Sequence, residues 1–443
     1  MPAPDTAVAQ SPEPWRLTYT PLFVLFTAYT FMILTYRATG ATIVMILALV
    51  CVVLQRAVVR APAFVWVFAA WVGWAGLSYT LNPTADAERW DALVEHAKLI
   101  LVVLVAVNAL RTPTQIRRYL LFVVVSFMVF PARSTLQNYV MGYTVFGRAV
   151  GPFIYANSND LAAISLLVLG PAFALWASEK SHRRLRWIGL GAAAALIVVV
   201  VLTQSRGGFL GLMTMLVPSA LVLVRRRPRT AVAMAVVLAA GLFAAPASFW
   251  QRMGGLSKAT SAETIGEMDP EGSARQRFAV MQNATRIISD HPLLGVGLGG
   301  YQQANAEYSP ALGRLDTHNT YLNVAAETGI PGLLIFLALV GNVLWSARDT
   351  LPGEGKRRGE ARDPDGERQY WLRSALAGYL VAALFGSYAR LSVTYIFISL
   401  VWVAARAAKA QLRIAPITYP TTAPHQPASG SAAHPAMIGS TAR

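Results

Sequence analysis

Long, uninterrupted apolar runs dominate this chain and limit what it can fold into. Of its 443 residues, 55% are hydrophobic and only 14% are charged, whereas a soluble domain carries about 25% charged residues. A helix of about 20 apolar residues crosses a hydrocarbon layer about 30 Å thick. Membrane barrel strands alternate apolar and polar residues, so these continuous runs exclude a closed β-barrel. The sequence therefore predicts an all-α integral membrane protein.

About twelve transmembrane helices and one large hydrophilic loop are predicted. Residues 1–19 form a cytoplasmic N-terminal segment without a cleavable signal pattern, and residues 20–248 contain helices one to nine. Residues 249–319 form the large loop, and residues 320–410 contain helices ten to twelve. Residues 411–443 are rich in Pro, Ala, Ser and Thr and are predicted to be a disordered cytoplasmic tail. The expected spans are 20–36, 41–55, 62–80, 93–110, 116–132, 159–178, 186–203, 208–224, 230–248, 320–346, 371–389 and 391–406.

The net charge of +16 is explained by membrane orientation. If the N-terminus is cytoplasmic, most of the 38 Lys and Arg residues fall on the cytoplasmic side, and short basic loops such as residues 225–229 make the bias strong. This is the positive-inside pattern, so the charge does not indicate nucleic-acid binding. The large loop 249–319 then lies on the opposite, extracytoplasmic side. A single cysteine, Cys51, can form neither an internal disulfide nor a cysteine metal cluster.

An amphipathic helix is predicted within the large loop, over residues 274–290. The apolar residues Phe278, Met281, Ala284, Ile287 and Ile288 recur there at helical spacing. A proline and a run of glycines follow over residues 292–300, and they end the helix and permit tight turns and close backbone approach. The alternating glycines resemble a dinucleotide-binding loop only superficially, because no strand–helix unit surrounds them.

His318 stands where the large loop meets the tenth expected span. Histidine has an unperturbed pKa of about 6.5 and can accept a proton near neutral pH. Neighbouring arginines and a helix N-terminus should lower its pKa and keep it neutral, while Asp316 or Glu327 could counter them. Its alternative role is a helix-end residue bonded to nearby backbone. The other histidines are interpreted as cytoplasmic (His182, His425, His434) or structural (His96, His291).

Several motifs together resemble the bacterial O-antigen ligase and O-antigen polymerase superfamily, and most closely the lipopolysaccharide O-antigen ligases. The family's loop helix usually carries a Trp where this chain has Met281, a departure that affects packing and not chemistry. The resemblance covers about residues 148–340. The matching features are Phe153, residues 159–162 (NDLA), residues 203–207 (TQSRG), Arg277, residues 291–297 (HPLLGVG), residues 318–322 (HNTYL) and residues 327–332 (ETGIPG).

The resemblance implies a GT-C-like integral-membrane glycosyltransferase in the bacterial inner membrane, with its active site facing the periplasm. The donor would be an O-antigen glycan on undecaprenyl diphosphate, and the acceptor a sugar hydroxyl of lipid A–core. No cofactor, metal or nucleotide sugar is implied. O-antigen polymerisation and transfer to a protein hydroxyl share this donor, and the motifs do not encode the acceptor. A lipid-linked glycan flippase is disfavoured, because transporters place polar residues midway along their spans.

Four arginines are candidates for binding the donor diphosphate: Arg206, Arg277, Arg275 and Arg148. Arginine presents a planar, permanently charged fork that pairs with phosphate oxygens. Arg206 adjoins two glycines at a span boundary, where a headgroup could approach closely. Each arginine could instead cover a solvated face or extend to the membrane surface, and this alternative carries more weight for Arg275 and Arg148.

Asn319, Tyr321 and Glu327 are candidate supporting residues. An acidic residue inside a membrane helix is costly and is usually functional or paired. Helical geometry places Glu327 more than two turns beyond His318, at about 1.5 Å per residue. We therefore interpret Glu327 as a structural partner of an arginine or of the backbone rather than a catalytic group.

Overall fold

The computed structural model consists of helices with one small β-hairpin. It describes residues 18–55, 57–82, 86–178, 182–226, 228–243, 245–255, 273–347 and 364–414. The longer helices, in chain order, are α2 (Pro21–Thr35), α3 (Ala41–Leu54), α4 (Ala63–Leu81), α5 (Ala87–Ala109), α6 (Pro113–Phe127), α8 (Ser158–Ser178), α9 (Arg183–Leu202), α10 (Arg206–Arg226), α11 (Pro228–Phe243), α14 (Ser273–Asp290), α16 (Thr320–Ser346), α17 (Pro364–Ala382) and α18 (Ser392–Ile414). Shorter elements are η1 (Met128–Ala132), α7 (Arg133–Val140), β1 (Thr144–Val145), β2 (Arg148–Ala149), η2 (Phe153–Ala156), α12 (Ala247–Gly254), α15 (Tyr301–Tyr308) and η4 (Ala383–Phe385).

The helices confirm the all-α membrane class. In the part of the chain that the structure describes, eight helices are long and apolar enough to cross a membrane, or nine if the bent pair α11–α12 is one span. Helices α2 and α3 are apolar but shorter, and α17 begins with Asp365 and Glu367 in its first turn. Each of the twelve expected spans overlaps a helix. The disordered tail was predicted to begin at residue 411, but α18 continues to Ile414.

Two helical boundaries differ from expectation. The fifth expected span was to end at residue 132, but the helix continues to Val140 through the π-helical turn η1, which contains Pro131. A π turn can accommodate a residue that lacks a backbone N–H. The eleventh and twelfth expected spans were separated only by residues 389–390. In the structure, α17 ends at Ala382, and a non-helical connection follows η4 before α18 begins.

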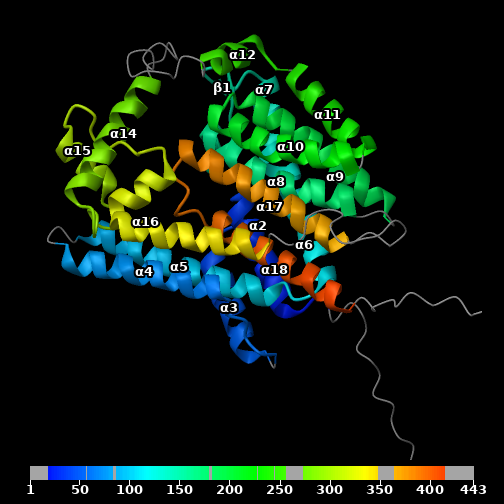
Figure 1. The fold of residues 1–443 in the computed structure, drawn as a ribbon, viewed down its shortest axis with the longest axis horizontal. Helices are drawn as coiled ribbons and strands as arrows, with labels where there is room; N and C mark the ends of the chain where they lie inside the picture. Colours follow the sequence, from blue (N-terminus) through cyan, green and yellow to red (C-terminus); the bar gives the residue numbers. More distant parts are fainter. Residues whose placement is uncertain are drawn as a thin grey trace, which may run out of the picture.

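The long helices form two packed groups (Figure 1). Helix α8 packs against α9 and α17, and α10 packs against α17, whereas α4 packs against α5 and α16, and α5 against α18. Contacts of α17 with α18 join the groups. Helices α10 and α17 approach closely at Gly211 and Gly378, where a Cβ on either residue would overlap the carbonyl oxygen of the other. Small residues at such crossings are typical of membrane helix pairs.

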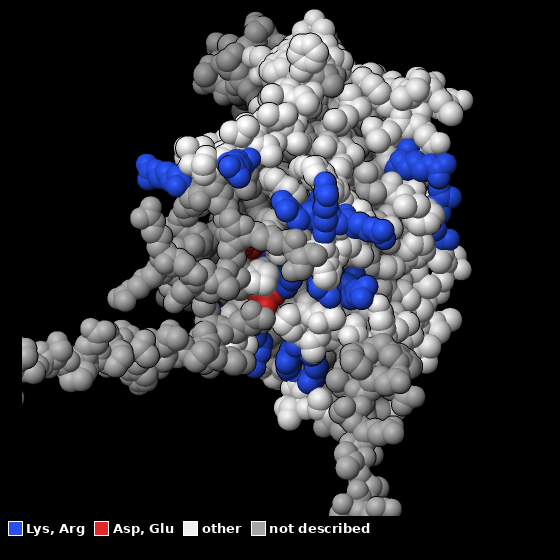
Figure 2. All heavy atoms as spheres, turned by 90° about the vertical axis from the view of Figure 1, so that its right-hand side faces the viewer, with Lys and Arg blue, Asp and Glu red and all other residues white. Residues whose placement is uncertain are grey.

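Basic side chains gather at one end of the bundle. Figure 2 shows that blue Lys and Arg side chains far outnumber red acidic ones on the face at the right of Figure 1. Arg60, Arg111 and Arg406 come from three separate segments, yet burial and the charges of the other two lower the pKa of Arg60. The charge pattern assigned all three to the cytoplasmic side, and the structure brings them to the same end.

Helices α14 and α15 lie beside the N-terminal half of α16 (Figure 1). Helix α14 coincides with the expected amphipathic helix, and its inner face packs on a small core separate from the main one. The expected apolar stripe is corrected in one place: Met281 is 37% exposed, and Val280 is buried instead. Val280, Ala284 and Ile287 form the buried stripe, a spacing of four and three residues that keeps them on one helical face.

Candidate functional site

Helix α16 is broken near its start, and the break fixes the large loop against the span. Gly329 has φ 72° and ψ 178°, a backbone conformation that is essentially restricted to glycine. The interrupted backbone groups find outside partners. The Ile330 N–H donates to the carbonyl of Pro292 (2.8 Å), and the Trp74 indole N–H donates to the carbonyl of Thr328 (2.8 Å). The motifs at 291–297 and 327–332 therefore form one structural unit.

Arg89, which sequence reasoning missed, anchors the glycine run of the loop. Its side chain is buried, pairs with Asp86 at 2.8 Å and donates from Nε to the carbonyl of Val296 at 3.0 Å. A Cβ on Gly297 would lie 2.9 Å from the Arg89 Cδ, and one on Gly300 would lie 2.6 Å from its Nε. The glycines thus leave room for a buried arginine. No nucleotide is needed to explain them.

His318 is held in an unusual backbone conformation at the entrance to α16. Its φ of 49° is left-handed, which is uncommon for a residue other than glycine. Hydrogen bonds on its C-terminal side fix it: the Asn319 N–H donates to Thr317 Oγ1 (3.2 Å), and Asn319 Oδ1 caps the helix by accepting from the N–H groups of Tyr321 (3.0 Å) and Leu322 (3.1 Å). Asn319 is therefore the helix cap, and the His318 side chain remains 35% exposed.

Burial and two neighbouring charges set the protonation of His318. Burial and the positive charge of Arg277 lower the pKa of His318, and the negative charge of Asp316 partly opposes them. The Asp316 carboxylate lies 3.9 Å from Nδ1, beyond hydrogen-bond distance, so it acts on the ring through its charge. Of the two acidic residues expected to counter the arginines, Asp316 is the one that acts. The imidazole is neutral at neutral pH and can accept a proton.

Arg277 connects His318 with the start of α8. Its guanidinium acts electrostatically on His318 and on Asp160, and the Tyr388 hydroxyl donates to the carbonyl of Asn159, next to Asp160 (3.2 Å). Arg275 lies two residues earlier on α14 and is exposed. Arg277 is therefore close enough to act on His318 through its charge, whereas Arg275 is exposed to solvent.

The connection between α17 and α18 joins the parts of the site, and no sequence motif predicted it. The Thr320 hydroxyl donates to the carbonyl of Gly386 (2.7 Å) and accepts from the Tyr388 N–H (2.9 Å). The hydroxyls of Thr317 and Ser387 are 3.2 Å apart. On its other side, the connection is adjacent to the start of α10, where a Cβ on Gly207 would overlap the ring of Phe385. Thus His318 and Arg206 flank the same connection.

Arg206 and Arg148 both bind backbone near the turn at residues 203–206. Arg206 begins α10, and its Nε donates to the carbonyl of Arg252 on α12 (3.2 Å). Arg148 on β2 donates to the carbonyl of Thr203 (2.9 Å) and to Asn159 Oδ1 (3.0 Å). Arg148 thereby braces the turn against the start of α8, a positioning role beyond the one expected for it.

Glu327 is buried and saturated with partners. Its Oε1 lies 3.3 Å from the Arg390 guanidinium and 3.4 Å from the Asn323 amide, and the backbone N–H groups of Gly299 and Tyr301 donate to its carboxylate. This agrees with the interpretation as a partner of an arginine and backbone. The arginine is Arg390, however, and not one of the four candidates.

Tyr321 has a structural role, because it links two helices of the site. Its hydroxyl donates to the carbonyl of Leu380 at 2.7 Å, which ties the first turn of α16 to the end of α17. A cavity of about 180 Å³ lies nearby and is lined by Asp316, Glu327 and Arg390 among others. Among the residues that the structure describes, no group of three or more His, Cys, Asp or Glu could hold a metal ion.

Comparison with protein families matches residues 191–337 to a family described as O-antigen ligase. The match covers about a third of the 443 residues and contains Arg206, Arg277, His318 and Glu327. It supports the resemblance to the O-antigen ligase and polymerase superfamily in the part of the chain that carries most of the candidate site. A search of curated proteins found no match to the chain.

Proposed function

We propose that this chain is an O-antigen ligase of the bacterial inner membrane. It transfers a glycan from undecaprenyl diphosphate to a sugar hydroxyl of lipid A–core on the periplasmic face. One observation carries the proposal: a partly exposed histidine stands at the entrance to a membrane helix, and burial and the charge of Arg277 lower its pKa. Both residues lie within the region that matches the O-antigen ligase family.

His318 is the general base in this reaction. Its Nε2 accepts the proton of the acceptor hydroxyl while the hydroxyl oxygen forms a bond to the anomeric carbon of the donor glycan. The bond between that carbon and the diphosphate oxygen breaks, and the leaving undecaprenyl diphosphate takes the electron pair. The proton then passes from the imidazolium to solvent or to the leaving group. A base positioned in this way contributes about 10²–10⁴-fold to the rate.

Arginines bind and stabilise the diphosphate. Arg277 and Arg206 are the principal candidates, with Arg275 and Arg148 as further contributors. Arg206 is the first residue of α10, so its charge adds to the partial positive charge of a helix N-terminus, which favours anions. Arg277 approaches from α14. In this proposal, the guanidinium groups supply the positive charge that the leaving group requires, and the reaction is metal-independent.

A choice among acceptors tests the proposal most directly. The purified chain is given lipid-linked O-antigen with a metal chelator and is offered lipid A–core, a second lipid-linked repeat unit or a pilin-like protein. We expect glycan on lipid A–core alone. Product on the lipid-linked unit would identify a polymerase, and product on the protein would identify a protein O-oligosaccharyltransferase. Either result would overturn the ligase assignment, and a requirement for added divalent metal would overturn the metal-independent mechanism.

A further inference from the structure

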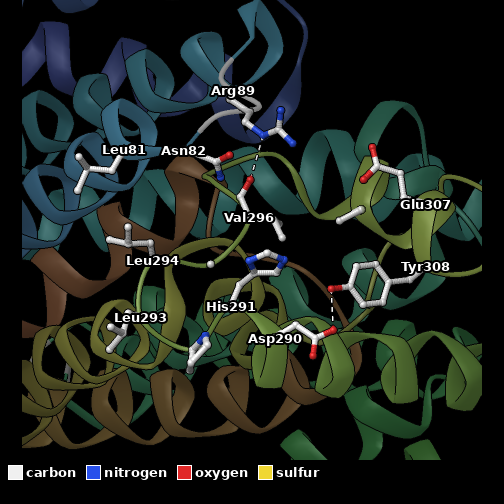
Figure 3. A pocket seen from close by; sticks show the side chains of 13 residues that line it. Leu81, Asn82, Arg89, Asp290, His291, Leu293, Leu294, Val296, Glu307 and Tyr308 are labelled. Carbon is white, nitrogen blue, oxygen red and sulfur yellow. Dashed lines mark hydrogen bonds between the residues drawn. The ribbon is translucent and has the colours of Figure 1, made fainter.

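A second cavity, of about 500 Å³, lies between the large loop and the ends of α4 and α5 (Figure 3). It is lined by the end of α14, the loop that follows it and the side of α15. His318 and the four candidate arginines do not line it. Its volume falls within the range of about 300–1,000 Å³ that is typical of small-ligand sites.

One wall of this cavity carries hydrogen-bonding side chains. Figure 3 shows Asp290, His291, Glu307 and Tyr308 grouped around it, with the Tyr308 hydroxyl donating to Asp290 Oδ2 at 2.8 Å. Burial and the hydrogen bond to Asp290 raise the pKa of Tyr308 to about 12, so its hydroxyl stays protonated. The His291 ring makes no hydrogen bond to any residue that the structure describes, so both of its nitrogens are available to a ligand.

The opposite wall is apolar and lies at the membrane boundary. Leu81, Leu293 and Leu294 form this side in Figure 3. Leu81 is the last residue of the membrane-spanning α4, and Leu81 and Leu293 are 60% and 67% exposed. A ligand in this cavity therefore meets polar groups on the side of the large loop and apolar groups at the edge of the membrane.

We propose that this cavity binds a neutral saccharide of a lipid-anchored glycan. Carboxylates, a phenol and an imidazole can hydrogen-bond several sugar hydroxyls, and the leucines can pack on the apolar face of a sugar ring. The charge of the lining selects against anions, because Asp290 and Glu307 face a single arginine, Arg89, which is already paired with Asp86. Diphosphate is thereby directed to the arginines near His318.

This inference rests on the proposed function, because that function supplies the two lipid-anchored glycans. The saccharide can come from the O-antigen of the donor or from the core of the acceptor. The cavity adjoins the loop at residues 290–296, which is bonded to the broken part of α16. A glycan held there is positioned relative to the helix that begins next to His318.

Direct binding tests the inference without requiring transfer. The full chain in lipid nanodiscs is titrated with three probes, and binding is followed by saturation-transfer NMR. The probes are dephosphorylated core oligosaccharide released from lipid A, O-antigen oligosaccharide released from its carrier, and inorganic pyrophosphate. We expect one of the two saccharides to bind and to identify the source. We expect Asp290→Asn and Glu307→Gln each to weaken that binding about tenfold, as loss of a charged hydrogen bond predicts.

Asp91→Asn is the matched control, because Asp91 is an exposed carboxylate on α5 outside the cavity, and its saccharide binding should be unchanged. Failure of both saccharides to bind, or equal binding by the Asp290 and Glu307 variants, would overturn the inference. Displacement of the bound saccharide by pyrophosphate would do the same. Saccharide binding that depends on Asp290 in a chain that transfers no glycan would refute the proposed function alone.

Discussion

His318 and Glu327 lie nine residues apart at the start of α16, and their surroundings are opposite. His318 is 35% exposed, adopts a left-handed backbone and has one acidic neighbour at 3.9 Å. The Glu327 side chain is 4% exposed and is bonded to Arg390, Asn323 and two backbone N–H groups. A group that must take up a proton has to be reachable and unsaturated. A group that joins a loop to a helix has to be buried and fully bonded.

The backbone explains how both kinds of residue occur so close together in the chain. Asn319 caps α16 and leaves His318 outside the helix. Gly329 breaks the helix two residues after Glu327, and the loop at residues 292–296 bonds to the break. The helical turns between Asn319 and Gly329 are therefore held at both ends, and the backbone at His318 is fixed in position.

Replacing His318 should have the largest effect on catalysis and little effect on stability. We expect His318→Ala to lower the transfer rate by about 10²–10⁴-fold, the usual contribution of a positioned base. Membrane insertion and the melting temperature should stay near those of the parent, because the side chain is half-exposed and its bonds are few. Transfer is measured on purified protein with lipid-linked O-antigen and lipid A–core.

His182→Ala is the control for this prediction. His182 is exposed at the start of α9, and its variant should transfer glycan at the parent rate. Parent-level transfer by His318→Ala would refute the assignment of His318 as the general base. His318 and Glu327 would then not differ in catalytic role.

The break in α16 should show the reverse pattern, a large effect on stability. A Cβ on Gly329 would overlap the carbonyl of Leu293 in addition to straining the backbone. Gly313 also has a positive φ, 67°, but nothing lies within 4 Å of its Cβ position. We expect Gly313→Ala to cost about 1 kcal/mol from strain alone, and Gly329→Ala to cost at least about 3 kcal/mol more. Thermal unfolding in detergent measures both, and equal destabilisation would show that the loop is not locked onto the break.

Removing the charge of Glu327 should have a smaller, structural effect. Glu327→Gln keeps the shape of the side chain but weakens its bonds to Arg390 and to the backbone. We expect a loss of about 1–3 kcal/mol, at the lower end because the Arg390 side chain is 43% exposed and stays partly hydrated. Glu95→Gln, on an exposed position of α5, should be neutral. A Glu327→Gln variant with parent stability but no activity would make Glu327 a catalytic group and abolish the contrast with His318.

The sequence predicted the features that depend on local pattern. Apolar runs located the helices, Pro292 marked the end of α14, and the position of His318 at a span entrance marked the candidate base. The burial of Glu327 implied a partner. All of these follow from hydropathy, helical periodicity or the chemistry of a single residue.

Features that depend on contacts between distant segments could not be predicted in this way. Arg89, Arg390 and the connection at residues 386–391 belong to no local motif, yet they hold the loop, Glu327 and Thr320 in place. Met281 was placed on the buried face because helical spacing cannot choose between neighbouring stripes until the packing partner is known. The one signal in the sequence for these contacts was the position of Arg390, a charged residue between two apolar runs.

The smallest predicted effect is a shift in pH dependence that reports the charges around His318. Burial and Arg277 lower the pKa of His318 below its ordinary value, so the neutral base predominates at neutral pH and is lost as the pH falls through the lowered value. Removing the positive charge in Arg277→Gln should raise this pKa and move the acidic limb of kcat/KM upward. Removing the negative charge in Asp316→Asn should move the limb downward, opposite to the effect of Arg277→Gln. The kcat/KM profile is the appropriate measurement because it reports ionisation of the free enzyme, and Arg275→Gln, which removes an exposed arginine of the same helix, should leave the limb in place. If both variants move the limb in the same direction, the titrating group is not His318, and its exposed position would then need another explanation.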